Sequence, residues 1–180
     1  MFVDRVQTWL REHGAETIDH PGGTLYAHLV RVHHRLAAHG AAPDLQLAGL
    51  AHAVYGTDGF DVTLLPRSER ATIRALVGEP AELLLYRYAA CDRRLTWRTL
   101  ADTCRVWDRF TGDVTVLAPE ELRPFADLSI VNELDVYEHS AEIAAKHGDD
   151  FRELFAAWAP IASEPVIADA RRVLGGFRTL

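Results

Sequence analysis

The sequence contains little cysteine, almost no lysine and no long run of apolar residues. Its 2 cysteines, Cys91 and Cys104, stand in no metal-binding or redox spacing, so we expect ordinary reduced thiols of a cytosolic protein. Only Lys146 among the 19 basic residues is a lysine, and we assign no site to this excess of arginine. The first 14 residues predict a charged amphipathic helix, which excludes a signal peptide or membrane span there and favours a cytoplasmic protein.

Basic charge is also in short supply. The formal net charge is −7 and the isoelectric point is near 5.7. Nucleic acid and anionic membranes both require a clustered basic face, so we expect neither as a partner. A small phosphorylated ligand stays open, and the expected partner is a small-molecule substrate. A homodimer is compatible with a helical bundle, although no heptad repeat indicates one.

Length and composition predict a single domain over residues 1–180. The chain is 48% hydrophobic and 25% charged, which suits one sizeable core. Helical periodicity dominates, and an alternating stretch that turns at Thr111-Gly112-Asp113 predicts a β-hairpin. The expected fold is therefore an all-α bundle with a small β-hairpin insertion. Helices are predicted over about 2–13, 24–38, 44–55, 64–77, 81–92, 119–147, 149–158 and 165–173, and the hairpin over 105–117.

Most of the 9 histidines fall between His20 and His52. His28 borders an apolar stripe at helical spacing, and His52 continues a second such stripe near a helix end. Two inward histidines on adjacent antiparallel helices can converge on one point. They can equally be core histidines that satisfy each other or the backbone. The other histidines on or just after the helix that carries His28 are expected on its solvated face. They are His33, His34 and His39.

The motifs around these histidines carry a resemblance. They read His20-Pro-Gly-Gly-Thr-Leu25, then Ala48-Gly-Leu-Ala-His52, then Tyr55-Gly-Thr57. The stretch resembles the HD superfamily of metal-dependent hydrolases, and locally the hydrolase domain of guanosine tetraphosphate hydrolases. It is most similar to a subgroup of HD-like domains of unknown function. The resemblance implies an HD-like helical bundle with His28 and His52 as metal ligands.

The chain departs from the HD pattern at three places. Ala53 stands where HD proteins have the Asp that follows the second histidine. Gly56 and Thr57 stand where guanosine tetraphosphate hydrolases keep an acidic pair, and only Asp58 lies nearby. The last ligand of the family is an Asp, and Asn132 occupies the best matching position.

These residues define a candidate site with a divalent transition metal, Fe, Mn or Zn, as the expected cofactor. Two imidazoles need a further ligand, for which the candidates are His20, Asn132, Asp135, Asp92 and Asp58. The candidate site residues fall into three groups: His28, His52, Asn132 and Asp135 as metal ligands; His20, Tyr55 and Asp58 for acid–base catalysis; and Tyr26, Phe60, Tyr88 and Asp92 for substrate binding.

Three functions fit this site. The first is a metal-dependent hydrolase acting on a small molecule, in which metal-bound water is the nucleophile. The second is an HD-like mononuclear iron oxygenase or lyase, with His20 or Tyr55 as acid or base. The third is a non-catalytic HD-like module that binds a ligand in the same pocket. Replacing His28 or His52 separates them, because only the first two functions lose metal and activity together.

Overall fold

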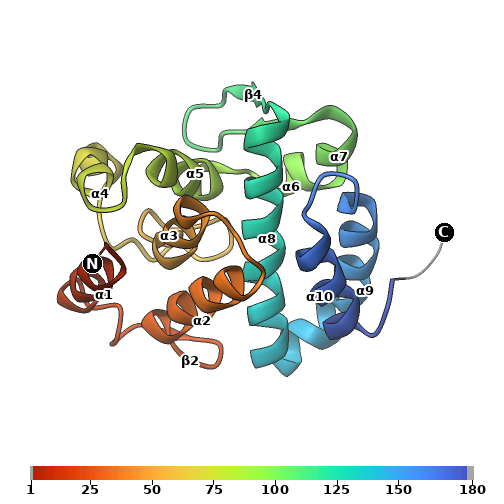
Figure 1. The fold of residues 1–180 in the computed structure, drawn as a ribbon, viewed down its shortest axis with the longest axis horizontal. Coiled ribbons are helices and arrows are strands. Elements are labelled where there is room, and N and C mark those ends of the chain that lie inside the picture. The colour runs from red at the N-terminus through yellow and green to blue at the C-terminus, as the bar shows by residue number, and fades with distance from the viewer. Residues whose placement is uncertain (1, 178–180) are drawn as a thin grey trace. The chain divides into compact units, whose positions relative to one another are not determined.

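The computed structural model describes residues 2–177 and has an all-α fold in which the strands form only small two-stranded antiparallel sheets (Figure 1). The predicted all-α class with a small hairpin is therefore confirmed. The chain divides into two compact units, Met1–Ala90 and Cys91–Leu180. The assignment of both units to a single domain stays a prediction. Within the described part of the chain, no helix has the length and apolarity needed to span a membrane.

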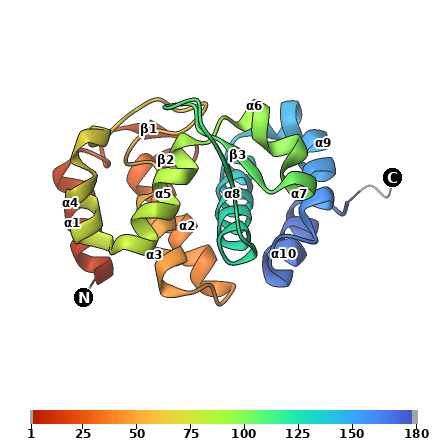
Figure 2. The ribbon, with the colours of Figure 1, turned by 90° about the horizontal axis from the view of Figure 1, so that it is seen from above.

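The N-terminal unit is a set of short helices around α3, which packs against α1, α2, α4 and α5 (Figures 1 and 2). Both α2 and α5 contribute an apolar face to this core, and Leu29, Val32 and Leu85 are completely buried in it. Its elements are α1 (Phe2–Glu12), β1 (Asp19–His20), β2 (Gly23–Thr24), α2 (Leu25–Ala38), α3 (Pro43–Ala51), η1 (Arg67–Glu69), α4 (Arg70–Val77) and α5 (Glu79–Ala90).

The C-terminal unit is built on one long helix, α8, which packs against α9 and α10 (Figure 2). Phe155 and Trp158 on α9 and Ile167 on α10 are buried in its core. Its elements are α6 (Arg93–Thr96), η2 (Trp97–Thr99), α7 (Leu100–Thr103), β3 (Arg105–Trp107), β4 (Val114–Val116), α8 (Pro119–His139), α9 (Ala141–Trp158) and α10 (Glu164–Leu174).

The predicted β3–β4 hairpin is present, with Trp107 opposite Val114. Its turn is held by Asp108, whose carboxylate accepts from the backbone amides of Phe110 and Thr111 at 2.7 and 3.1 Å. Gly112 adopts a φ of 81°, which a residue with a Cβ rarely takes. Gly112 belongs to the Thr111-Gly112-Asp113 turn from which the sequence predicted this hairpin, and Asp108 adds a second turn-forming side chain.

The predicted helix break at Gly148 is wrong, because the chain breaks at Ser140 instead. Ser140 has an extended backbone, and its hydroxyl accepts from the amide of Ile143, so it caps a new helix. Gly148 lies inside α9, where an added Cβ would come 3.3 Å from Tyr137 of α8. Here glycine permits close helix packing and does not end a helix.

Two details of the central helices also differ from the sequence prediction. The second central helix ends at Ala51, and His52 is its C-cap residue, so the chain turns earlier than the predicted end near Tyr55. The prediction that His33 is solvated is wrong. His33 is buried, and its Nδ1 lies 3.1 Å from the carbonyl oxygen of Gln46 on α3. This contact joins α2 to α3.

Candidate functional site

The N-terminal unit brings His28 of α2 and His52 of α3 into direct contact. Each side chain is only 1% exposed, and the two Nε2 atoms are 3.3 Å apart. The rings meet edge to face, with 5.2 Å between their centroids and 80° between their planes. The inward orientation that the apolar stripes predicted thus produces a buried histidine pair.

The backbone selects the tautomer of His52. Its Nδ1 lies 2.8 Å from the carbonyl oxygen of Gly49, and a carbonyl can only accept a hydrogen bond, so Nδ1 carries the proton. In the neutral ring, Nε2 therefore has its lone pair directed at His28. Either a proton on Nε2 of His28 or a metal ion can meet that lone pair.

His20 covers His28 from the β1–β2 hairpin. Its ring stacks on that of His28 at a centroid distance of 4.0 Å, and Phe60 meets His20 edge to face at 5.2 Å. The hairpin is clamped by Arg31 of α2, which donates to the carbonyl oxygens of Pro21 and Gly22 at 3.0 and 3.1 Å. A side chain on α2 therefore helps to hold His20 over the buried pair.

Tyr88 of α5 closes the other side of the pair. Its buried ring meets His52 edge to face with 5.3 Å between centroids. We call His20, His28, His52, Phe60 and Tyr88 together the histidine cluster. Two imidazoles in contact, surrounded by aromatic rings, form a site that can bind a metal ion or move a proton, and His20 is its partly exposed histidine.

Tyr55 lies in a different polar network. Its hydroxyl donates to Oε1 of Glu82 at 3.1 Å, and Arg70 donates to both oxygens of the same carboxylate at 2.6 and 2.9 Å. Burial, together with the charge of Glu82, raises the pKa of the Tyr55 hydroxyl well above its ordinary value. The hydrogen bond to Glu82 raises the pKa of Arg70. The hydroxyl of Tyr55 is thus held neutral in a structural contact.

Sequence reasoning missed Glu82, the centre of this network. Its side chain is 0% exposed, and Arg74 lies 3.6 Å away as a second cation. A signal was present in the sequence, because Glu82 precedes Leu85 and Ala89 at spacings of three and seven and so falls on the buried face of α5. A carboxylate on a buried face requires cations, which Arg70 and Arg74 supply from α4.

Two further predicted residues of the N-terminal unit have other contacts. Tyr26 accepts a hydrogen bond from Arg11 of α1, whose guanidinium also lies over the tyrosine ring. Asp58 lies in the tight turn that Thr57 and Phe60 close with two backbone hydrogen bonds of 2.8 and 2.9 Å. This turn positions Phe60 for its contact with His20.

The remaining predicted residues belong to the C-terminal unit. Asp92 is the N-cap of α6 and accepts from the amide of Leu95 at 2.9 Å. Asn132 on α8 donates to Glu133 at 2.8 Å, and the same carboxylate oxygen is held by Arg93 at 2.7 Å. Asp135, also buried, lies 3.6 Å from Nδ1 of His139.

The donor set of the histidine cluster fits a metal ion in part. Two nitrogens bound to one tetrahedral zinc ion at ordinary bond lengths stand about 3.3–3.4 Å apart, and the two Nε2 atoms are separated by 3.3 Å. The hydrogen bond from His52 to Gly49 is the type of contact that orients a histidine ligand. Among residues 2–177, however, no three His, Cys, Asp or Glu side chains gather as a metal-binding group.

Comparison with known proteins gives one match. Residues 9–93 match the model of a family described as a domain of unknown function, DUF6817. The matched stretch contains every residue of the histidine cluster. No curated protein and no solved structure shows significant similarity to the chain.

Proposed function

We propose that this chain is an HD-like protein that binds a divalent transition metal at His28 and His52 and acts on a small molecule, with hydrolysis as the first candidate reaction. The single observation that supports the proposal is the 3.3 Å contact between two buried imidazole nitrogens from two different helices. The motifs from His20 to Thr57 add the resemblance to HD hydrolases.

Each residue of the cluster has a role in this proposal. His28 and His52 would hold the metal, and Gly49 keeps Nε2 of His52 available by accepting from Nδ1. A bound metal of this kind lowers the pKa of water and polarises an oxygen of the substrate. His20 is the favoured acid–base residue because it stacks on His28 and is partly exposed, whereas the hydroxyl of Tyr55 is engaged by Glu82.

The identity of the metal separates two reaction classes. Zinc or manganese would favour hydrolysis. Iron would favour an oxygenase or lyase reaction, which is compatible with two histidines and an incomplete ligand set. A second candidate function is a non-catalytic module that binds its ligand in the same pocket. Within residues 2–177, no three His, Cys, Asp or Glu side chains form a group that could hold a metal ion, and this finding favours the second candidate.

The test is elemental analysis of the untagged protein before and after incubation with zinc, manganese and ferrous iron. Wild type is compared with His28→Ala, His52→Ala and, as a matched control, His34→Ala, which removes an exposed histidine from α2. We expect about one metal ion per chain in wild type and control. Both cluster variants should lose it while their circular dichroism spectra remain native.

Two results would contradict the metal proposal. One is a wild-type protein that takes up none of the three metals. The other is metal that remains in folded His28→Ala and His52→Ala variants, because that metal would be bound elsewhere. A metal-free wild type would leave the ligand-binding module as the function to pursue.

A further inference from the structure

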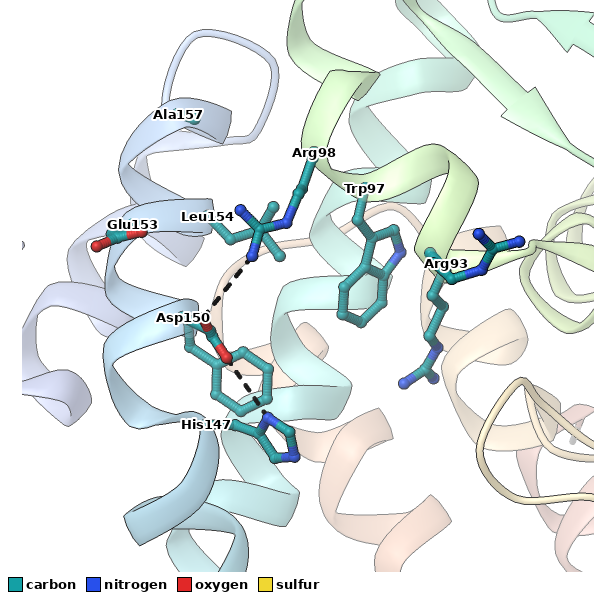
Figure 3. A pocket seen from close by; sticks show the side chains of 10 residues that line it. Arg93, Trp97, Arg98, His147, Asp150, Glu153, Leu154 and Ala157 are labelled. Atoms are coloured by element: carbon teal, nitrogen blue, oxygen red, sulfur yellow. Dashed lines mark ion pairs between the residues drawn. The ribbon is translucent and has the colours of Figure 1, made fainter.

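A pocket with a volume of 420 Å³ lies within the C-terminal unit, between the α6–η2 segment and α9 (Figure 3). This volume falls in the range of about 300–1,000 Å³ that is typical of sites for small molecules and cofactors. Of the candidate site residues predicted from the sequence, Asp92 is the one next to this region, and it caps α6. The pocket is formed by residues that are far apart in the chain, so periodicity alone could not reveal it.

Aromatic side chains form the wall of the pocket. Trp97 lies between the two helical segments in Figure 3, and Phe151 and Leu154 line the α9 side. Trp158 supports Trp97 by two contacts. Its Nε1 donates to the carbonyl oxygen of Trp97 at 3.1 Å, and the two indoles meet edge to face. Phe151 stacks on Phe155. A supported indole and phenyl ring offer a planar ligand a rigid surface for stacking.

Basic side chains line the same pocket. Arg93, Arg94 and Arg98 come from the α6–η2 segment, and His147 comes from α9. Arg93 is engaged, since it pairs with Glu133 at 2.7 Å and lies over the Trp97 ring. Arg94 and Arg98 are the two exposed guanidinium groups. Guanidinium groups bind carboxylate and phosphate oxygens with two parallel hydrogen bonds.

The acids of the pocket make only long contacts with these basic side chains. Asp150 lies 3.9 Å from Arg98 and 3.6 Å from His147, as the dashed lines in Figure 3 show. The Arg98 side chain is 82% exposed and that of Asp150 is 60% exposed, so water screens the pair. Asp150 and Glu153 both belong to α9, which leaves the α6–η2 side cationic.

We propose that this pocket binds a planar aromatic molecule carrying a phosphate or carboxylate group, with the ring on Trp97 and the anionic group on Arg94 and Arg98. An anion that forms paired hydrogen bonds to a guanidinium can replace the long contact of Arg98 with Asp150. The ring contributes apolar contact that a free anion lacks, so the pocket selects for both parts on one molecule. The site belongs to the C-terminal unit, and none of its lining residues belongs to the histidine cluster.

Isothermal titration calorimetry on the full chain tests this proposal. The probes are adenosine monophosphate and indole acetate, which carry a ring and an anion, together with adenosine and inorganic phosphate, which carry only one of the two. We expect at least one of the two combined probes to bind at least about tenfold more tightly than either partial probe, because both parts contribute. Preference between the combined probes shows which pairing of ring and anion the pocket favours.

Variants locate the binding. The double variant Arg94→Gln, Arg98→Gln should bind the probe about tenfold or more weakly. The control is Arg105→Gln, because Arg105 is exposed on β3 and does not line the pocket, and this variant should keep the wild-type affinity. Ala157→Trp should block the pocket without changing its charge. Lack of binding by both combined probes overturns the proposal. Equal binding of phosphate alone, or unchanged affinity in the folded pocket variants, overturns it as well.

Discussion

Adjacent histidines in this chain have opposite environments. His33 is buried and contacts the carbonyl of Gln46, whereas His34, the next residue, is exposed. Periodicity placed both on the outer face of the helix, because neither belongs to the apolar stripe of α2, which runs past them to Leu36. The burial of His33 depends on where α3 packs, which a pattern within α2 does not contain. Environment, and not residue type, separates a structural histidine from a candidate ligand.

Tyr55 allows a prediction about stability at alkaline pH. Its pKa is raised in the folded protein, so the protonated hydroxyl contributes stability that is fully present below the ordinary tyrosine pKa of about 10 and is lost as pH rises further. We expect the free energy of unfolding to fall more steeply between about pH 9 and pH 11 in wild type than in Tyr55→Phe. Urea denaturation at both pH values measures this difference.

The control for this prediction is Tyr26→Phe, which removes a hydroxyl from the partly exposed contact with Arg11. At neutral pH, Tyr55→Phe should itself cost about 1 kcal/mol, since Arg70 still satisfies the Glu82 carboxylate. If the free energy of unfolding falls equally with pH in wild type and Tyr55→Phe, Tyr55 is not the cause of the loss of stability at alkaline pH.

At the scale of elements, short irregular segments position the candidate site. The β1–β2 hairpin holds His20, the turn at Thr57 to Phe60 holds Phe60, and the C-cap of α3 is His52 itself. Each segment is tied to a helix or closed on itself by hydrogen bonds, as Arg31 does for the first hairpin. Regular helices supply His28 and Tyr88, and their ends and connections supply the other members of the cluster.

The packing of α8 against α9 gives a prediction for Gly148. An added Cβ would come 3.3 Å from Cε2 of Tyr137, so a branched side chain at this position must displace that ring. We expect Gly148→Val to destabilise the protein by about 1–3 kcal/mol. Adding Tyr137→Ala should recover part of this loss, which a double-mutant cycle by urea denaturation measures. Additive losses in the cycle would argue against contact between these two positions.

At the scale of the whole molecule, the prediction of a single domain can be tested by cooperativity. Trp97, Trp107 and Trp158 belong to the C-terminal unit and only Trp9 to the other, so tryptophan fluorescence reports mainly on one unit. Circular dichroism reports on helices of both. A single domain predicts coincident urea transitions by the two probes. Separate transitions would instead show that the two compact units unfold independently.

Much of the fold was accessible from the sequence because its signals are local. Gly112 marks the turn of the β3–β4 hairpin, and prolines mark the first turns of α3, α8 and α10. The helix end predicted at Gly148 was wrong because glycine has two uses. Its backbone freedom lets it end a helix, and its lack of a Cβ lets two helices pack closely. Ser140 carried the correct signal as a helix cap, which the apolar periodicity running past it obscured.

The sequence by itself determined the all-α class, the β3–β4 hairpin and the inward direction of His28 and His52, since each follows from spacing along one segment. Only the tertiary structure decided that the two imidazoles touch and that His20 stacks on His28. It also decided that Tyr55 donates a hydrogen bond to Glu82 and that a pocket lined by aromatic and basic side chains lies beside α9. These contacts join residues from different elements. Their distances depend on how helices pack, which local periodicity does not specify.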